Sequence, residues 1–394
     1  MKRFSRLATA SSLAIAVVVS LGTPAFAHSD SGSRHGRDHQ SAPDHRHDTQ
    51  GADHVVFVQT DDPAGNSVVA YDRAQDGTLT PAGTYPTGGN GGILTGSVVD
   101  HLASQGSLTY DADHALLFAV NAGSNTVSVF SARDDQLTLE QTVPSYGSFP
   151  VSVAVHDDLV YVLNGLNGGS VQGYRIHSGR LAPIDDSNRA LGLDPAATPQ
   201  FVNTPGQVAF SPDGSQLIVT TKANGSAIDV FRIERHGTPA DAPVVNSEPG
   251  TVPFAVTFDR GGNLVVSQAG TNALATYDLH RDGTVTLLDQ VLTGQAATCW
   301  VVGVDGQLYA SNAGSGSLSR VQVGNGGDLT FLDNTGTDPG TVDAAVSAHG
   351  QFLYVQTGAN GIVDEYRIND DGSLAAIGSV TVPNAVGGEG IVAV

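Results

Sequence analysis

The chain has 394 residues, of which 39 are acidic and 18 are lysine or arginine, giving a net charge of −21. Such a surface repels phosphate backbones and anionic lipid, so we expect neither nucleic acid nor a membrane surface as a partner. The single cysteine, Cys299, excludes an intramolecular disulfide, and a chain of this length can instead build a large hydrophobic core.

Residues 1–27 have the features of a secretory signal peptide. A basic start that includes Lys2 and Arg3 precedes an apolar stretch, which ends at the small-x-small cleavage sequence Ala-Phe-Ala. The apolar stretch is shorter than the about 20 residues that a membrane-spanning helix needs. We therefore expect a secreted, extracellular protein without membrane insertion, and we expect a monomer.

Residues 28–54 contain almost no apolar side chains, so we expect a disordered tail that cannot offset the entropy of ordering. Six of the 13 histidines lie in this tail. Imidazole binds zinc, copper and nickel well, which makes His45 and His47 candidate metal ligands. The alternative is a solvated linker, because no spacing resembles a closed zinc site with four ligands. Nothing else in the sequence predicts a cofactor.

The remaining chain, residues 55–394, is built from a repeated phrase. Asn121 to Phe130 reads NAGSNTVSVF, and Asn312 to Val321 reads NAGSGSLSRV. Weaker copies occur in between and on both sides, each an apolar strand, a turn rich in Asn and Gly, and a strand that closes on a large apolar residue. The closing residues are Tyr71, Phe130, Tyr174, Phe231, Tyr277, Val321 and Tyr366. Most are 44 to 46 residues apart, with two longer steps of 57 and 59, and this period is typical of propeller blades.

Two more strands can be predicted around each hairpin, joined by turns in which Asp-Gly supplies the positive φ angles of tight hairpins. Four antiparallel strands per repeat, seven times over, predict an all-β, seven-bladed β-propeller. The tail Gly387–Val394 resembles the first strand of a blade, whereas Val55 begins directly on a second strand. We therefore expect the C-terminal strand to pair within the first blade and close the ring. The asparagine of the repeated phrase is most simply a turn residue.

Over residues 54–394 the chain resembles the propeller lactonases, which include bacterial 6-phosphogluconolactonase and the fungal carboxy-muconate cyclase. Residues 104–130, residues 205–231 and the closing GGEGIVAV carry the likeness. The resemblance implies a seven-bladed propeller with YVTN-type repeats, which acts on a lactone or its open-chain acid at one mouth of the central channel.

The proposed catalytic groups of this family are not matched. They are a His and an Arg at the starts of inner strands and a Glu at the end of a neighbouring second strand. This sequence has Val151 in place of the His, Gly206-Gln207 in place of an Arg-His pair, and Thr221-Lys222 in place of an Asn-Glu pair. The resemblance therefore implies the scaffold and transfers no catalytic residue.

In a propeller, the loops that enter the inner strands share one face with the turns between second and third strands, and a ligand would meet the channel there. The candidate substrate-binding residues on this face are Gln105, Gln207, Gln268, Trp300, Asp343 and Gln356. Lys222 is the only lysine after residue 2, and together with Glu389 it would orient a carboxylate substrate and move a proton if the two face each other. The alternative is that Lys222 is a solvated turn residue and Glu389 only neighbours the closing strand.

The longest insertion, Pro86–Leu108, is rich in glycine and predicts a flap over the channel mouth. Asp100 and His101 near its end are candidates for a general-base dyad, and the alternative is an ordinary surface loop. Cys299 begins another inner strand and would be a nucleophile if a base lowered its pKa, or a small buried hydrophobe otherwise. No serine-hydrolase, nucleotide-binding or zinc-protease motif occurs.

Three functions remain open at this point. The first is a secreted lactonase-like enzyme that hydrolyses or forms a lactone of a small anionic carboxylate or sugar acid at the channel mouth. The second is a non-catalytic propeller that binds an extracellular glycan, peptide or cell-wall partner. The third is metal handling by the histidine-rich tail, with the propeller as its anchor. The family resemblance favours the first.

Overall fold

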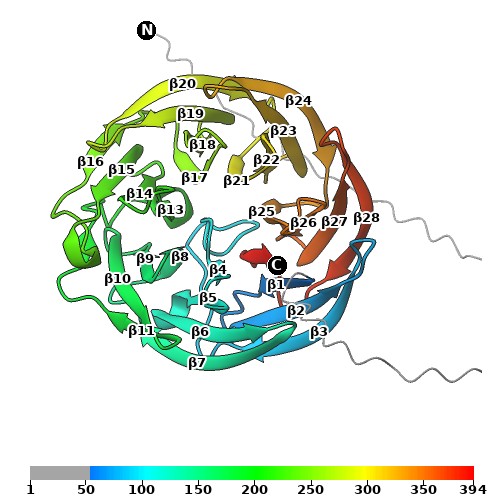
Figure 1. Cartoon of the computed structure of the whole chain (residues 1–394), viewed down its shortest axis with the longest axis horizontal. Coiled ribbons are helices and arrows are strands. Elements are labelled where there is room, and N and C mark those ends of the chain that lie inside the picture. The colour runs from blue at the N-terminus through cyan, green and yellow to red at the C-terminus, as the bar shows by residue number, and fades with distance from the viewer. Residues whose placement is uncertain (1–53) are drawn as a thin grey trace, which may run out of the picture. The chain divides into compact units, whose positions relative to one another are not determined.

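The computed structural model describes residues 54–394. The predicted signal peptide and the histidine-rich tail up to residue 53, with His45 and His47, lie outside the described residues. The described residues form seven antiparallel sheets that surround a central axis as blades (Figure 1). The prediction of an all-β, seven-bladed β-propeller is confirmed.

Within a blade the strands follow one another from the axis outward in chain order, and only blade 1 takes its inner strand from the end of the chain. Blade 1 consists of β29 (Ile391–Ala393), β1 (Val55–Gln59), β2 (Ser67–Arg73) and β3 (Leu79–Pro86). Blade 2 consists of β4 (Leu108–Asp111), β5 (Leu116–Asn121), β6 (Thr126–Arg133) and β7 (Gln136–Pro144). Blade 3 consists of β8 (Pro150–His156), β9 (Leu159–Asn164), β10 (Ser170–His177) and β11 (Arg180–Pro183), with the short β12 (Arg189–Ala190) also paired to β10.

The other four blades have four strands each. Blade 4 consists of β13 (Pro205–Phe210), β14 (Gln216–Thr221), β15 (Ala227–Arg232) and β16 (Val244–Ser247). Blade 5 consists of β17 (Pro253–Phe258), β18 (Leu264–Gln268), β19 (Ala273–Leu279) and β20 (Val285–Leu292). Blade 6 consists of β21 (Thr298–Val304), β22 (Gln307–Asn312), β23 (Ser317–Val323) and β24 (Leu329–Gly336). Blade 7 consists of β25 (Thr341–Val346), β26 (Phe352–Thr357), β27 (Ile362–Ile368) and β28 (Leu374–Thr381).

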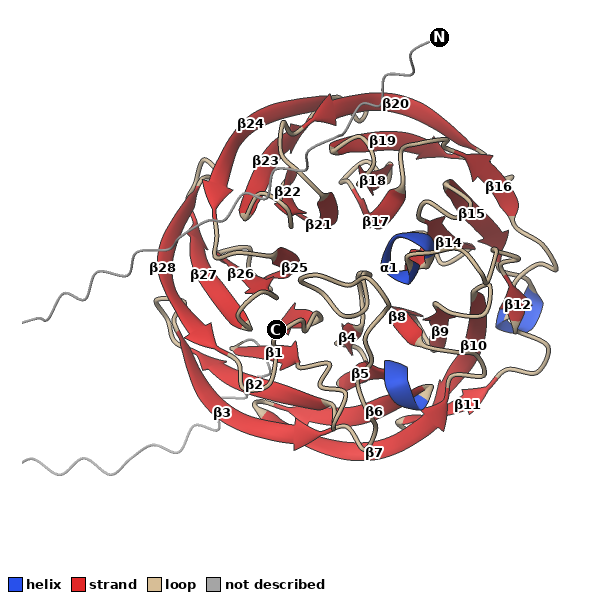
Figure 2. Ribbon diagram, turned by 180° about the vertical axis from the view of Figure 1, so that it is seen from behind, coloured by secondary structure: helices blue, strands red, loops and turns tan. Residues whose placement is uncertain are grey.

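Helical structure is confined to short turns, which Figure 2 shows in blue. They are α1 (Gln200–Asn203) and the 3-10 turns Ala122–Ser124 and Arg235–Gly237. Within residues 54–394 no helix is long and apolar enough to span a membrane.

The burial pattern explains why the repeats form these strands. The second strand of a blade lies between two neighbouring blades, so both of its faces are covered and it is apolar almost throughout; β5, LLFAVN, is buried at all 6 positions. The outermost strand has only one covered face, and β20 is accordingly exposed or half-buried along its length. The closing residue of the repeated phrase is buried in every blade.

The asparagine of the repeated phrase forms hydrogen bonds across its own hairpin. Asn121 Nδ2 donates to Thr126 Oγ1 at 3.1 Å and to Ser128 Oγ at 2.8 Å. Asn312 Nδ2 donates to Ser319 Oγ at 2.9 Å in the same manner. These bonds join the second and third strands across the turn, so the structural interpretation of the asparagine is confirmed.

The ring closes as the sequence predicts. β29 pairs antiparallel with β1, in the register Val56 with Ala393, Phe57 with Val392 and Val58 with Ile391. Figure 1 shows the red C-terminal strand beside the blue β1. This pairing gives blade 1 its innermost strand and ties the two ends of the described chain together in one sheet.

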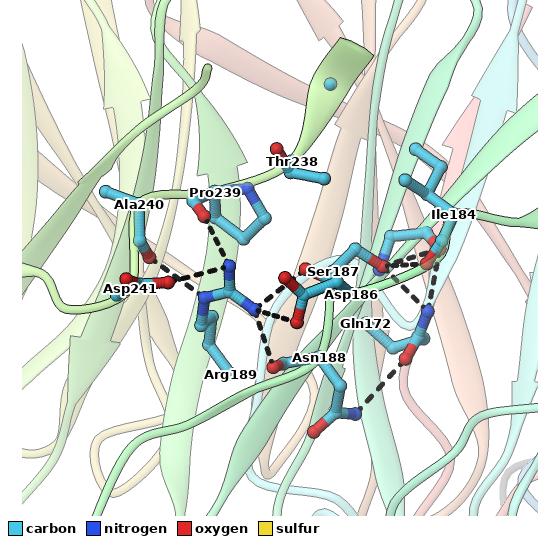
Figure 3. A network of polar contacts seen from close by, with 12 residues as sticks. Gln172, Ile184, Asp186, Ser187, Asn188, Arg189, Thr238, Pro239, Ala240 and Asp241 are labelled. Carbon is cyan, nitrogen blue, oxygen red and sulfur yellow. Dashed lines mark hydrogen bonds and ion pairs between the residues drawn. The ribbon is translucent and has the colours of Figure 1, made fainter. Parts of the chain in front are cut away.

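The two long steps in the repeat period are two insertions on the propeller. One lies between β3 and β4, and the other, residues 184–204, lies between β11 and β13. The second insertion is tied to blade 4 by Arg189, whose side chain is only 11% exposed. Its guanidinium donates to the carbonyl oxygens of Pro239 at 2.9 Å and Ala240 at 3.1 Å (Figure 3). Arg189 thus fixes the outer end of this insertion.

The ring closure is tested by Ile391→Ala. Ile391 is 4% exposed, and removing a buried isoleucine side chain from a packed core costs about 3 kcal/mol. We expect the free energy of unfolding, measured by urea denaturation, to fall by that amount. The matched control Ile93→Ala removes the same atoms from a side chain that is 54% exposed, and we expect a change below about 0.5 kcal/mol. Equal losses in the two variants would contradict the role of β29 as a packed closing strand.

Candidate functional site

The first insertion fills the centre of the propeller. Figure 1 shows the cyan connection before β4 extending into the middle of the ring. Ser104 Oγ donates to the Val151 carbonyl of blade 3 at 2.8 Å, and Gln105 N donates to the Gly206 carbonyl of blade 4 at 3.1 Å. We call residues 87–107 the plug. The sequence predicts a flap over the mouth, and residues 87–103 lie there: Gly123 N, in the turn between the second and third strands of blade 2, donates to the Asn90 carbonyl at 3.1 Å, and Val98 is 81% exposed. Only the end of the plug, from Ser104 onward, bonds to the inner strands.

Two side chains fix the plug to blade 6. Both ends of the Gln105 amide bond to the main chain of Val301: Nε2 donates to its carbonyl at 3.1 Å and Oε1 accepts from its N–H at 2.9 Å. Trp300 Nε1 donates to the Ser104 carbonyl at 2.5 Å. With these bonds the plug spans the channel from blade 3 to blade 6.

Lys222 joins the plug to the second insertion. Its ammonium donates to the Ala103 carbonyl of the plug at 2.5 Å and to the Phe201 carbonyl of the second insertion at 2.7 Å. It also lies 5.2 Å from the centre of the Phe254 ring, within range of a cation–π interaction. Lys222 is 1% exposed, so the solvated-turn alternative is wrong. Burial lowers the pKa of the ammonium to about 8, and the charges of Asp100 and Glu389 oppose this shift.

A pocket of about 630 Å³ opens between the plug and blades 4, 5 and 6, and we call it the mouth pocket. Its walls are mainly apolar and include Phe254 and Trp300, whose ring centres are 4.8 Å apart. The only ionisable side chains that line it are Asp100, Lys222 and Cys299. Two of the sequence-predicted catalytic residues therefore meet at one pocket.

Asp100 is the carboxyl of the mouth pocket. Burial raises its pKa to about 6, while the positive charge of Lys222 acts in the opposite direction. Its Oδ1 atom is buried and has no hydrogen-bond partner within residues 54–394. At neutral pH the site therefore contains a carboxylate with an unused acceptor close to a protonated amine.

Glu389 lies behind the mouth pocket and does not line it. Its carboxyl group accepts from Ser104 N at 3.1 Å and lies 2.5 Å from Ser104 Oγ, so it anchors the plug to blade 1. Its own N–H donates to Asp61 Oδ2 at 2.8 Å. Burial, followed by the negative charges of Asp100 and Asp61, raises the pKa of Glu389 well above its ordinary value. The charge of Glu389 in turn acts to raise the pKa of Lys222.

Asp61 and Asp343 complete a buried acidic cluster with Glu389 and Asp100. Burial raises the pKa of Asp61 to about 7 and that of Asp343 to about 7. Lys222 is the only cation that acts on this cluster within the described part of the chain. Part of the cluster therefore holds protons near neutral pH. No group of three or more His, Cys, Asp or Glu side chains in residues 54–394 is arranged to hold a metal ion.

His101 is directed away from its sequence neighbour Asp100. Its imidazole Nδ1 lies 3.3 Å from the Asp61 carbonyl, and its main-chain N–H donates to the Gly387 carbonyl at 2.7 Å. Burial lowers the pKa of the imidazole, which is therefore neutral at pH 7. Asp100 and His101 make no side-chain hydrogen bond to each other in the described residues, so the pair lacks the contact of a general-base dyad.

The predicted substrate-binding residues fall into three places. Trp300 lines the mouth pocket, whereas Gln105, Gln207 and Asp343 line a second pocket of about 360 Å³, formed by the inner strands beyond the plug. Gln268 and Gln356 line neither of these two pockets: each is buried, and their amides donate to Tyr277 Oη at 2.9 Å and to the Gln59 carbonyl at 3.1 Å.

Cys299 is buried among apolar groups. Burial raises the pKa of its thiol far above the usual range, so the thiol stays protonated. This favours the interpretation of Cys299 as a small hydrophobe.

Sequence reasoning missed Asp61, Ser104 and Phe254. Asp61 lies two residues after the end of the buried strand β1 and has a positive φ of 52°, which is a turn conformation that aspartate tolerates. An aspartate at the end of an apolar strand was therefore an available signal. Ser104 and Phe254 have no comparable signal, because their roles depend on contacts with distant segments.

Comparison with known proteins gives the family context. Residues 26–190 match the protein family described as "Lactonase, 7-bladed beta-propeller". The resemblance to the propeller lactonases is confirmed. A search of curated protein sequences finds no significant match.

Solved structures share the propeller lactonase fold at low sequence identity. A Bacteroides uniformis protein provisionally assigned as a 6-phosphogluconolactonase has a TM-score of 0.70 and 19% identity, over 86% of this chain and 99% of that chain. The periplasmic gluconolactonase of Pseudomonas aeruginosa has a TM-score of 0.69 and 18% identity, over 86% and 98% of the two chains. Virginiamycin B lyase from Staphylococcus aureus has a TM-score of 0.53 and 13% identity, over 74% and 89%. At these identities the likeness establishes the fold, and the function has to be argued from the site.

The acidic cluster predicts an unusual dependence of stability on pH. In the folded protein Asp61 binds a proton up to about pH 7, compared with 3.8 for the free group. Between these values the folded state holds more protons than the unfolded state, so the free energy of unfolding falls as pH rises, and the loss is complete above pH 7. From pH 5.5 to pH 8 we expect the wild type to lose about 2 kcal/mol more than Asp61→Asn, measured by urea denaturation.

The control for this experiment is Asp72→Asn, which removes an exposed carboxylate from the same blade. Its pH slope should equal that of the wild type, since both retain the cluster. If Asp61→Asn and Asp72→Asn have the same slope, Asp61 is not protonated in the folded protein at pH 5.5.

Proposed function

We propose that the protein is a secreted hydrolase that opens a lactone in the mouth pocket, with Asp100 as general base and Lys222 as the group that stabilises the oxyanion. The observation that carries this proposal is that these two side chains, from the plug and from blade 4, meet at one pocket at the channel mouth of a lactonase-type propeller. Glu389 raises the pKa of Lys222 through its charge and holds the plug in place.

The chemistry requires one water molecule and these two groups. The Asp100 carboxylate accepts a proton from the water as its oxygen bonds to the lactone carbonyl carbon. The carbonyl oxygen becomes an oxyanion, to which the Lys222 ammonium donates. When the ring C–O bond breaks, the leaving alkoxide takes the proton from Asp100. The product is a hydroxy acid, and the carboxylate is regenerated.

The hydrogen-bond inventory of the site is compatible with these roles. An ammonium group has three N–H donors, and Lys222 uses two on the carbonyls of Ala103 and Phe201. One donor remains for a substrate oxygen. Asp100 Oδ1 is buried and has no partner within the described residues, so its capacity to accept a hydrogen bond is unused.

Non-catalytic binding is the second candidate, and the same feature of Lys222 favours it. An ammonium that already bonds two carbonyls at 1% exposure also serves as a purely structural link between the insertions. In that case lactones bind in the mouth pocket and are released unchanged.

Asp100→Asn tests the proposed base. An amide cannot accept the proton, so we expect kcat for lactone hydrolysis to fall about 100- to 10,000-fold, with KM nearly unchanged. Hydrolysis is followed by proton release in a weakly buffered indicator assay. The matched control is Asp229→Asn in β15: Asp229 is also buried, its pKa is also raised to about 6, and its Oδ1 also lacks a partner among the described residues. Equal activity of the two variants would eliminate Asp100 as the base.

The two pKa values predict a bell-shaped pH profile of kcat/KM. Activity needs Asp100 ionised, which occurs above about pH 6, and Lys222 protonated, which holds below about pH 8. We expect a maximum near pH 7, with Glu389 and Cys299 as the other ionisable groups that act on Lys222. The profile of Asp100→Asn should lose its acidic limb and keep its alkaline limb. A wild-type profile that rises steadily to pH 9 would indicate attack by free hydroxide and contradict the mechanism.

A further inference from the structure

The mouth pocket also carries information on the substrate. Its volume of about 630 Å³ is in the range that buries most of the surface of a drug-sized ligand. An unsubstituted five- or six-membered lactone ring on Asp100 and Lys222 would leave most of this space unfilled.

The walls of the pocket favour apolar groups. Apart from Asp100, Lys222 and Cys299, the lining consists of valine, alanine, phenylalanine, tryptophan and glycine. A sugar lactone would bury several hydroxyl groups against these walls, and each hydroxyl without a hydrogen bond costs about 1–3 kcal/mol. A phosphorylated substrate would in addition meet the net charge of −21 and the buried acidic cluster.

The apolar walls are held rigidly. The Trp300 ring is fixed by its bond to the Ser104 carbonyl, and it packs against Phe254, which in turn lies beneath the Lys222 ammonium. On the opposite side the plug contributes Val98 and Val99. Val98 is 81% exposed at the pocket, so a hydrophobic group bound there would remove it from water.

We infer that the substrate is an uncharged lactone with an apolar alkyl or acyl substituent, the ring lying against Asp100 and Lys222 and the substituent between the plug valines and the Phe254–Trp300 wall. This inference rests on the proposed function and specifies its substrate class. It replaces the anionic or sugar-acid substrate that the family resemblance implies.

A series of lactones tests this inference. The probes are γ-butyrolactone, γ-octalactone and γ-dodecalactone, with glucono-δ-lactone as the polyhydroxylated comparison. Each methylene that enters the pocket should raise kcat/KM about fourfold until the pocket is filled. We expect γ-octalactone to exceed γ-butyrolactone by at least 50-fold, and glucono-δ-lactone to be the poorest substrate.

Ala313→Phe is the variant for the same series. Ala313 lines the mouth pocket away from Asp100 and Lys222, and it is only half-buried, so a larger side chain fits at this turn and reduces the apolar space. The ratio of kcat/KM for γ-octalactone to that for γ-butyrolactone should fall at least tenfold. The control is Ala64→Phe, an exposed alanine in the corresponding turn of blade 1, which should keep the wild-type ratio.

Binding is measured separately through fluorescence. Trp300 is the only tryptophan of the chain and it lines the pocket, so its emission reports occupancy. Cyclopentanone and 2-pentylcyclopentanone are analogues that cannot be hydrolysed, and the second should bind at least 50-fold more tightly. Lactone turnover with no gain along the series, or with equal binding of the two ketones, overturns the substrate class and leaves the proposed function intact. Absence of turnover with all four lactones overturns the proposed function, and the substrate class with it.

Discussion

The ammonium group of Lys222 donates to one carbonyl from each of the two insertions that interrupt the propeller repeat. No other contact in the described site joins the plug, the second insertion and blade 4 at one atom. The second insertion also meets the plug directly, through the bond from Thr95 N to Gln200 Oε1 at 2.9 Å. The buried charge of Lys222 therefore fixes the point at which the plug, the second insertion and blade 4 meet, and the low dielectric of its surroundings strengthens every bond that this charge makes.

The charge of Lys222 directly lowers the pKa of only one of the buried acids, Asp100. An isolated carboxylate away from water is so costly that it takes up a proton instead, and four such groups near one ammonium cannot all be ionised. The described cluster resolves this through hydrogen bonds from the main chain, such as Glu389 N to Asp61, and through raised pKa values. A propeller with seven packed interfaces has enough core to sustain this local destabilisation, which is typical of functional sites.

The fold could be predicted from the sequence because every blade repeats the same pattern of apolar strands and polar turns. Three features recur with the period of a blade: an apolar second strand, a turn that an asparagine such as Asn121 stabilises, and a bulky closing residue. The pairing of β29 with β1 could be predicted because the first repeat lacks an inner strand. The site could be predicted only in part, because much of it is formed by the plug and the second insertion, which are not part of the blade repeat. Lys222 and Asp100 were identified by residue type, but the carbonyls that hold Lys222 come from residues 103 and 201, and nothing local to a turn indicates that its lysine is buried by such distant segments. For the same reason the sequence did not show that Ser104 and Gln105, at the end of the plug, bond to the inner strands of blades 3 and 4.

A plug in the middle of the ring means that the propeller axis is not a passage. The mouth pocket and the second pocket are lined by different parts of the plug: Val98, Val99, Asp100 and Ala103 line the first, and Gln105 and Gly106 line the second. A molecule that enters the mouth pocket therefore leaves through the same opening. A departing molecule and an incoming one compete for this opening. The rate at which the bound molecule dissociates past the valines at the rim then limits the rate at which the next molecule binds.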